Sequence, residues 1–351
     1  MSMKPRIAID AMGGDEGVSV MIAGAALARH RHDRFKFLLV GDEAQIKSAL
    51  DEHPNLRAAS EILHSDGTVT GDDRISQALR KSKTSSMGLA IQAVKNGDVS
   101  AAVSGGNTAA MMAMAKLALR TMPGIDRPAL AAKLPTLTKN DVIMLDVGAN
   151  TIVEKQNLVE FAIMGAAYSR IALGIKRPRT WLLNIGSEDQ KGKEEIREAA
   201  EILRQISGDH MDFKGFIEGD KINRGDADVI VSEGFSGNIA LKTVEGTARF
   251  VTDLLKQAFT SSIRSKFGFL VSRPATELLR THLDPNNHNG AVFLGLNGVV
   301  VKSHGSANAK GVANAVEVAA RLVEEDITAR IAHDLLDINK GAPSSSGPSG
   351  K

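Results

Sequence analysis

The chain has 351 residues, which is enough for one large α/β domain or for two average domains. A net charge of +2 and an aromatic content of 4% argue against nucleic-acid binding, and no apolar run approaches the ~20 residues that cross a bilayer. The sequence contains no cysteine, so disulfides, cysteine-ligated zinc and a thiol nucleophile are excluded. A strand pattern follows the first few residues directly, so we expect a cytoplasmic protein without a secretory signal.

The first strand pattern, "PRIAID" at 5–10, runs into the glycine-rich turn "AMGGDEG". A turn of this kind before a helix is typical of phosphate cradles, but this one carries acids and no cation, and acids repel phosphate. We expect Gly13 and Gly14 to let the backbone pass close to a ligand. We expect Asp10 and Asp15 to orient the turn through hydrogen bonds.

Seven further apolar runs have the length of buried strands, and they lie at 35–41, 99–105, 142–148, 180–186, 213–219, 228–234 and 298–305. Helical patterns separate most of them, at 85–96, 107–120, 155–174, 192–207 and 236–258. This alternation favours an α/β fold with a mainly parallel sheet covered by helices on both faces. No linker or fixed-period repeat is evident, so we predict a single domain over 1–340.

The strand at 99–105 ends in "SGGNTAA", which opens the next helical pattern. Gly106 frees the backbone, and Asn107 and Thr108 add side-chain donors at a helix N-terminus, an arrangement that suits an anion such as phosphate. The same residues fit a tight strand–helix turn that Asn or Thr caps. The sequence leaves both interpretations open.

Two more strands end in polar loops, "DVGAN" with Asn150 and "NIGSEDQKG" with Glu188 and Lys191. Lys191 follows a strand end, where a cation is well placed to point into a cleft beside the strand ends. The alternative is an ordinary solvated lysine within a run of charges.

The loops "SEGFSGNIALK" (232–242) and "VKSHGSAN" (301–308) have the same pattern, in which glycines follow a strand and precede a helix. The backbone near Gly237 and the side chain of Asn238 are suited to hold an oxyanion or a phosphate. Lys302 adds a cation, and His304 titrates near neutral pH and is suited to acid–base work. A hydrogen-bonded structural histidine is the alternative for His304.

Five strand ends therefore share one polar, glycine-rich pattern. Because the carboxyl ends of parallel strands meet at one edge of a sheet, we expect these loops to converge there on an amide-rich, lightly cationic site. The signatures HExxH, GxSxG, GxxxxGK[ST] and GxGxxG do not occur. We expect a site without a metal or a cofactor.

The segment 254–283 differs from the rest, because its helical pattern mixes exposed-looking apolar residues at 267–271 with four basic residues and breaks near Ser272–Pro274. It is suited to meet an acidic protein or a membrane surface, with an ordinary packed helix pair as the alternative. The last stretch, 341–351, is rich in Pro, Ser and Gly, and we predict a disordered tail.

Taken together, the motifs resemble the bacterial phosphate acyltransferases of phospholipid synthesis, the acyl-carrier-protein:phosphate transacylases. The resemblance covers residues 5–335 and is carried by "AIDAMGGD" (8–15), "SGGNTAAMMAMAKLAL" (104–119), "GIDRPAL" (124–130), "LDVGAN" (145–150), "NIGSEDQKG" (184–192), "SEGFSGNIALK" (232–242), "NGAVFLGLNG" (289–298) and "VKSHGSAN" (301–308).

The resemblance implies transfer of a long-chain acyl group from acyl carrier protein to inorganic phosphate, giving an acyl phosphate that a membrane acyltransferase passes to glycerol 3-phosphate. It also implies a three-layer α/β/α fold related to phosphotransacetylases and to the isocitrate-dehydrogenase-like group, a homodimer, and peripheral membrane association. The sequence departs from the usual family pattern at Gly105, Ala109 and 151–153, where an expected acid is missing. That departure puts in doubt any role for a carboxylate after Asn150.

We hypothesise that Asn107, Thr108 and nearby amides bind phosphate with Lys191, that Asn238 and the Gly237 region stabilise the oxyanion, and that His304 is an auxiliary proton donor. Rival hypotheses are a phosphotransacetylase that uses short acyl-CoA and a scaffold without catalytic activity. A decarboxylating dehydrogenase of the same fold group is more distant, because it needs metal-binding acids and a nucleotide site.

Overall fold

Every apolar run predicted as a strand forms one in the computed structural model, which describes residues 5–341. The sheet has eleven strands in the order β3-β2-β1-β4-β11-β10-β5-β6-β9-β7-β8. The strands are β1 (Arg6–Asp10), β2 (Lys36–Gly41), β3 (Ser60–His64), β4 (Ala101–Ser104), β5 (Ala129–Leu134), β6 (Val142–Leu145), β7 (Arg179–Leu183), β8 (Asp212–Ile217), β9 (Val229–Val231), β10 (Ala291–Leu294) and β11 (Val299–Lys302).

The predicted helices are also confirmed, as α5, α6, α7, α8 and α9. The helices are α1 (Val18–Arg31), α2 (Glu43–Leu50), α3 (Pro54–Arg57), α4 (Ile75–Arg80), α5 (Ser86–Asn96), α6 (Thr108–Leu119), α7 (Lys155–Ala172), α8 (Glu194–Ile206), α9 (Gly234–Thr260), α10 (Ile263–Val271), α11 (Arg273–Leu283), α12 (Ala309–Glu324) and α13 (Ile327–Gly341), with short 3₁₀ turns η1 (Gly219–Lys221) and η2 (Pro285–His288). The tail predicted at 341–351 lies outside the described residues, apart from Gly341.

The strand directions correct one expectation. The block β3-β2-β1-β4-β11 is parallel, and so is the block β6-β9-β7-β8, but three antiparallel pairs through β10 and β5 separate the two blocks. The blocks therefore run in opposite directions. The carboxyl ends of β1, β4 and β11 lie at one edge of the sheet and those of β6, β7 and β9 at the other, so the expectation that all five loops meet at one edge is wrong.

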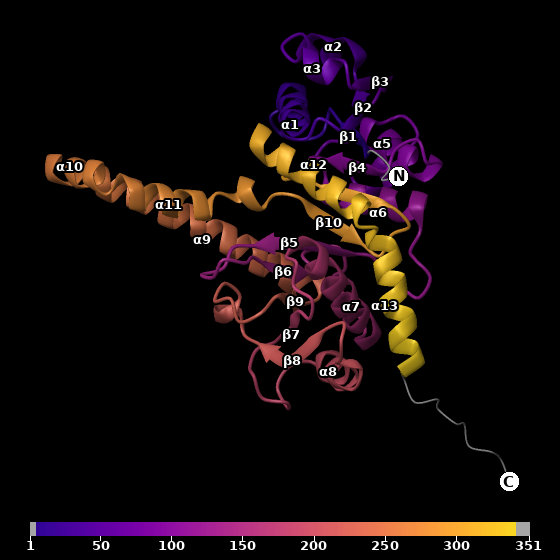
Figure 1. Cartoon of the computed structure of the whole chain (residues 1–351), viewed down its shortest axis with the longest axis vertical. Coiled ribbons are helices and arrows are strands. Elements are labelled where there is room, and N and C mark those ends of the chain that lie inside the picture. Colours follow the sequence, from indigo (N-terminus) through magenta and orange to yellow (C-terminus); the bar gives the residue numbers. More distant parts are fainter. Residues whose placement is uncertain (1–4, 342–351) are drawn as a thin grey trace.

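Helices cover both faces of the sheet, which confirms three α/β/α layers (Figure 1). The helices α1, α7, α8, α12 and α13 pack on one face, and α5, α6 and the first part of α9 lie on the other. Successive side chains of a strand point to opposite faces, so Val292 and Leu294 of β10 enter one cluster and Phe293 the other.

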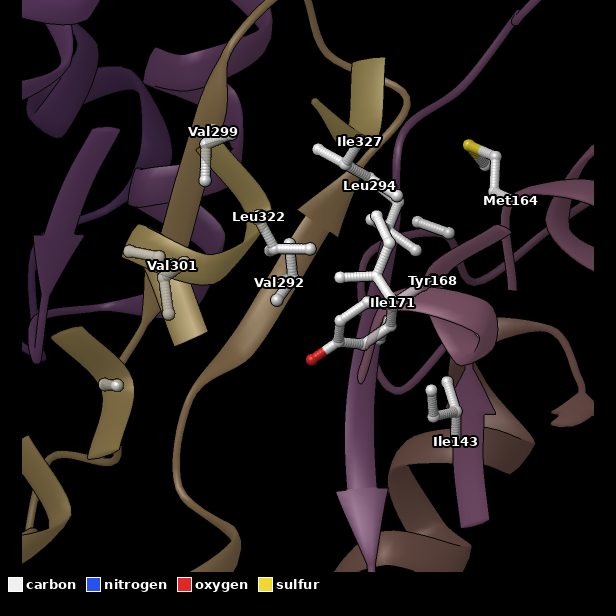
Figure 2. Close-up of a cluster of buried hydrophobic side chains, with 14 of the residues drawn as sticks. Ile143, Met164, Tyr168, Ile171, Val292, Leu294, Val299, Val301, Leu322 and Ile327 are labelled. Carbon is white, nitrogen blue, oxygen red and sulfur yellow. The ribbon is translucent and has the colours of Figure 1, made fainter. Parts of the chain in front are cut away.

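The core on the first face joins the two blocks of the sheet. Figure 2 shows side chains of β10 and β11 gathered with those of α7, α12 and α13, among them Val292, Leu294, Val299, Val301, Leu322, Ile327, Tyr168 and Ile171. Each fully buried aliphatic side chain of this kind contributes roughly 1.5–3 kcal/mol of transfer free energy. This packing covers one face of the antiparallel centre of the sheet, and the apolar cavity described below lies on the opposite face.

The arm, which we define as residues 249–283, leaves the body of the molecule (Figure 1). It consists of the end of α9 and the helices α10 and α11, and neither α10 nor α11 has a buried residue. The break predicted near Ser272–Pro274 is confirmed between α10 and α11, and a second break at 261–262 turns the chain back. The rings of Phe259 and Phe269 pack 5.3 Å apart and tie α9 to α10.

Candidate functional site

Two glycine turns pack against each other where β1 and β4 end. A Cβ atom on Gly13 would lie 2.6 Å from Oδ2 of Asp10 and 3.0 Å from the amide nitrogen of Gly106, so only glycine allows this approach. The buried Asp10 accepts hydrogen bonds from the hydroxyl of Ser104 at 2.6 Å and from the amide of Met12 at 3.3 Å. Asp10 therefore locks the two turns together, as the sequence predicted for an orienting acid.

The first cavity, which we call the glycine-turn cavity, encloses about 580 Å³ beside these turns. Gly14, Asp15, Gly106 and Asn107 line it, together with the loop at 68–71. Two glycine turns and the start of α6 contribute backbone to this wall, and backbone N–H groups at such a turn can hold an anion.

Asn107 caps helix α6. Its Oδ1 accepts the N–H of Ala110 at 3.0 Å, and its Nδ2 donates to the carbonyl oxygen of Gly71 at 3.0 Å. The capping interpretation of this side chain is thus confirmed. The N–H groups of Thr108 and Ala109, which open the helix, have no partner within the helix and form the positive end of its dipole.

The second cavity, which we call the apolar trough, encloses about 410 Å³ between α9 and the sheet. Leu130, Ala132 and Leu134 of β5 lie on its sheet side, and Leu241 and Val244 of α9 lie opposite them. The trough also includes Gly148 and Asn238, whose Cγ would lie 3.5 Å from a Cβ at Gly148. Helix α9 starts after β9, so Asn238 lies beside Gly148 of the loop after β6. The helix then crosses this face and brings Lys242 and Glu245 to the side of the trough that Thr108 and His304 line.

The two cavities meet at five residues that line both, which we call the junction: Thr108, Ala109, Lys242, Lys302 and His304. The Lys302 ammonium is buried and donates to the carbonyl oxygens of Gly105, at 3.1 Å, and Ser303. Burial lowers the pKa of Lys302 to about 8, against the opposing charge of Asp15. The junction therefore holds a cation whose charge is easily lost.

His304 is held with one ring nitrogen toward the protein. Its Nδ1 accepts from the amide and lies 3.0 Å from the hydroxyl of Ser306, so Nε2 carries the proton of the neutral ring and lies 4.0 Å from Oε2 of Glu245. Burial lowers the pKa of His304 more than Glu245 raises it. A neutral imidazole near pH 7 is suited to pass a proton.

Lys242 and Glu245 were not predicted as site residues. The Nζ of Lys242 lies 2.8 Å from Oε2 of Glu245, and both line the trough. Helical spacing could have identified them, since these residues follow Asn238 by four and seven positions and so share its helix face. The sequence does not show that this face lies over the sheet, because that depends on the path of α9.

Asn150 and Gly237 lie outside both cavities. Nδ2 of Asn150 donates to the carbonyl oxygen of Pro128 at 2.8 Å and to Asp146 at 2.9 Å, and the amide of Gly237 donates to Glu233 at 2.9 Å. A Cβ on Gly237 would lie 1.9 Å from the carbonyl oxygen of Asp146, so this glycine allows α9 to pass close to the loop after β6. Their geometry is that of structural residues, and their binding roles stay predictions.

Lys191 and Glu188 form an exposed ion pair of 2.9 Å in the loop before α8. Neither lines the glycine-turn cavity or the apolar trough. Glu188 raises the pKa of Lys191, which keeps its charge. The role of Lys191 toward phosphate stays a prediction.

No group of three or more His, Cys, Asp or Glu side chains within 5–341 is placed to hold a metal ion. No helix in the same range has the length and hydropathy needed to cross a membrane.

Comparison with solved structures gives the fold. A phosphotransacetylase from Streptococcus pyogenes superposes with a TM-score of 0.60 at 18% identity, covering 92% of this chain and 95% of that one. The EutD phosphotransacetylase from Staphylococcus aureus gives 0.58 at 16% identity, with the same coverage. The chain therefore has a phosphotransacetylase-like α/β fold, as predicted.

Comparison of sequences gives the family. The family described as "Fatty acid synthesis protein" matches residues 5–330. A phosphate acyltransferase of Erythrobacter litoralis (strain HTCC2594) is 70% identical over 336 residues, which cover 96% of this chain and 95% of the relative. A phosphate acyltransferase of Rhodopseudomonas palustris (strain BisA53) is 52% identical over 336 residues, covering 95% and 96%. The chain is thus an acyltransferase of the phosphate acyltransferase family, in which an acyl group is transferred to phosphate.

Proposed function

We propose that this enzyme transfers a long-chain acyl group from acyl carrier protein to inorganic phosphate, and so makes an acyl phosphate for phospholipid synthesis. The observation that carries the proposal is the meeting of a polar, backbone-lined cavity with an apolar trough at one cationic junction. Phosphate matches the first and an acyl group the second. A membrane acyltransferase that acylates glycerol 3-phosphate would consume the product.

Phosphate binds in the glycine-turn cavity in this proposal. The N–H groups of Thr108 and Ala109 donate to its oxygens at the positive end of α6, and the ammonium of Lys302 supplies charge. Lys242 adds a second cation at the rim of the junction. Lys191 lies in the loop after β7, at the opposite edge of the sheet, and is not part of this set.

The reaction needs no nucleophile from the protein, in agreement with a chain that lacks cysteine. A phosphate oxygen attacks the thioester carbonyl, a C–O bond forms, and the C–S bond breaks. The proton that hydrogen phosphate loses ends on the departing thiol, whose pKa of about 8.5 lets it leave without a strong acid. The enzyme contributes by holding the two reactants together.

Asn238 and His304 serve the reacting atoms in this proposal. Asn238 lines the trough and is suited to donate to the oxyanion that forms on the carbonyl. His304 lines both cavities, and its Nε2–H is suited to donate its proton to the departing thiol, after which the proton that phosphate loses restores it.

The arm supports binding of acyl carrier protein and of a membrane surface by a cytoplasmic protein. Phe267, Leu270 and Val271 at its tip are 68%, 65% and 69% exposed, in helices that also carry basic residues such as Arg264 and Lys266. Apolar side chains beside cations are suited to enter the interface of an anionic bilayer, and the cations are suited to an acidic carrier protein.

A homodimer is supported by an apolar surface near the start of α9. Phe235 and Ile239 lie one helical turn apart and are 61% and 52% exposed. Ile152 and Ile185, both largely exposed, lie nearby, since the carbonyl of Asn150 accepts the amide of Gly234 and Ile185 shares a cavity wall with Ser236. Exposed apolar patches of this kind mark protein–protein contacts.

Release of free carrier-protein thiol from palmitoyl carrier protein, measured with and without phosphate, tests the proposal. We expect release only with phosphate, together with an acyl phosphate that hydroxylamine traps. Release that ignores phosphate would overturn the proposal. A phosphotransacetylase that uses short acyl-CoA is the rival, and it would prefer acetyl-CoA over the carrier-protein substrate.

A further inference from the structure

We propose that the acyl chain lies in the apolar trough, under α9, with its reactive end at the junction and its far end at the base of the arm. The inference rests on the proposed function, because it needs an acyl donor of some kind. It adds the route of the chain and the residues that set its length.

The floor of the trough is a row of side chains across three neighbouring strands. Lys302 of β11 pairs with Ala291 of β10, and the register of β10 with β5 places Ala132 next along the same row. All three line the trough, and neighbouring strands lie about 4.8 Å apart. The floor therefore leads away from the charged junction over two small side chains, which leave room for a chain.

The roof is one face of α9. Leu241, Val244 and Ala248 follow one another at three- and four-residue spacing and line the trough, and so they form a continuous apolar stripe above the floor. Leu283 and Pro285 close the far end, where the chain returns from the arm to the body. The trough thus ends between the two segments that carry the arm.

Three polar side chains of the wall that lie beyond the junction, those of Asn286, His288 and Asn289, already have partners in the protein. Asn289 donates to the hydroxyl of Ser303 and accepts the amide of His304, both at 2.8 Å. Asn286 accepts the amide of Asn308 at 3.0 Å, and Nδ1 of His288 lies 3.2 Å from Asp141. A pantetheine arm carries amides that need hydrogen-bond partners when buried, whereas an alkyl chain needs none. The occupant is therefore the alkyl chain.

Two variants test the depth of the trough, with butyryl and palmitoyl thioesters of carrier protein as probes. Ala132→Phe fills the middle of the floor and Ala248→Phe fills the far end. We expect both to lower palmitoyl turnover at least tenfold while butyryl turnover stays within twofold. Ala58→Phe, at an exposed alanine after α3, is the matched control and should change neither.

The outcomes separate the inference from the proposed function. Equal losses with both thioesters would place the pantetheine arm in the trough, and unchanged palmitoyl turnover would place the acyl chain elsewhere; either result overturns the inference while butyryl transfer to phosphate still supports the function. Failure of the wild type with both thioesters would overturn the function itself.

A second measurement does not depend on turnover or on packing of a larger side chain. Because the chain has no cysteine, Ala248→Cys places a single thiol at the far end of the trough. We expect palmitoyl carrier protein, without phosphate, to slow maleimide labelling of this thiol at least fivefold, and butyryl carrier protein to leave it unchanged. Equal labelling with both would overturn the inference, and Ala58→Cys reports any effect unrelated to the trough.

Discussion

The ammonium of Lys302 is buried, and burial disfavours its positive charge. A phosphate bound at the junction would need that charge. Since burial lowers the pKa of Lys302 to about 8, the charge is lost as pH rises through that value. We expect KM for phosphate to rise across this pH in the wild type and to stay flat in Lys302→Arg, because a guanidinium keeps its proton. Steady-state rates at saturating acyl donor give KM for phosphate in both proteins at each pH. A wild-type KM that does not change with pH would contradict the role of Lys302 in phosphate binding.

The same lowered pKa makes a prediction about stability. An unfolded lysine keeps its proton up to a pKa of 10.5, so between about 8 and 10.5 the unfolded chain binds more protons than the folded one. The contribution of Lys302 to the free energy of unfolding therefore increases as pH rises through that range. Chemical denaturation should show a smaller rise in Lys302→Met, and identical pH slopes would show that the side chain is not buried in solution.

Lys191 is the cation that the sequence favours, although it lines neither cavity. Its predicted role is to supply charge to phosphate, so Lys191→Ala should lower acyl phosphate formation at least tenfold, as measured by the thiol-release assay. Lys214→Ala is the control, since Lys214 also pairs with a carboxylate on the surface. Near-wild-type rates for Lys191→Ala would leave Lys302 and Lys242 as the cations of the site.

At the scale of elements, the arm and the site share one helix. Residues 238, 242 and 245 of α9 line the trough, and the end of the same helix enters the arm. The structure places the exposed apolar residues of α10 at the far end of the arm (Figure 1). The helix thus joins the surface that we propose for membrane contact to the place where the acyl group reacts.

The arm carries its own prediction. We expect the double variant Phe267→Glu/Phe269→Glu to lose co-sedimentation with anionic liposomes, because two charges in the interface cost more than the remaining apolar residues gain. Leu117→Glu is the matched control, since Leu117 is 65% exposed on α6 in the body. Unchanged binding of the arm variant would remove the arm as the membrane contact, while the thiol-release assay shows whether the enzyme stays active.

The elements that the sequence did not predict explain what it could not place. Strand β5, "ALAAKL", is rich in alanine, which has low β propensity, and β10 has only four residues. Without these two strands the reversal of direction in the sheet is invisible, and so the loops after β6 and β9 were expected at the wrong edge. Long-range pairing decided this point, and no local pattern records it.

At the scale of the whole molecule, four residues named from the sequence lie around one cavity. Thr108, Asn238, Lys302 and His304 were named from strand-end loops, and all four line the trough. Their grouping has a different cause from the one expected, because Asn238 stays beside the loop after β6 and the trough under α9 joins it to the other three residues. The chemistry of the loops could be read locally, whereas the path of one helix required the fold.

The apolar surface near the start of α9 gives the prediction for the assembled molecule. Phe235 and Ile239 lie at the edge of the sheet opposite the glycine turns, and neither lines the glycine-turn cavity. A second copy bound there would therefore leave that cavity open. We expect Phe235→Glu/Ile239→Glu to turn a dimer into a monomer in sedimentation-velocity experiments, because like charges would face each other across a two-fold contact. Ile75→Glu, at an exposed isoleucine of α4, should leave the dimer intact. A variant that stays dimeric would move the contact to another surface, and a wild type that sediments as a monomer would remove the dimer from the proposal.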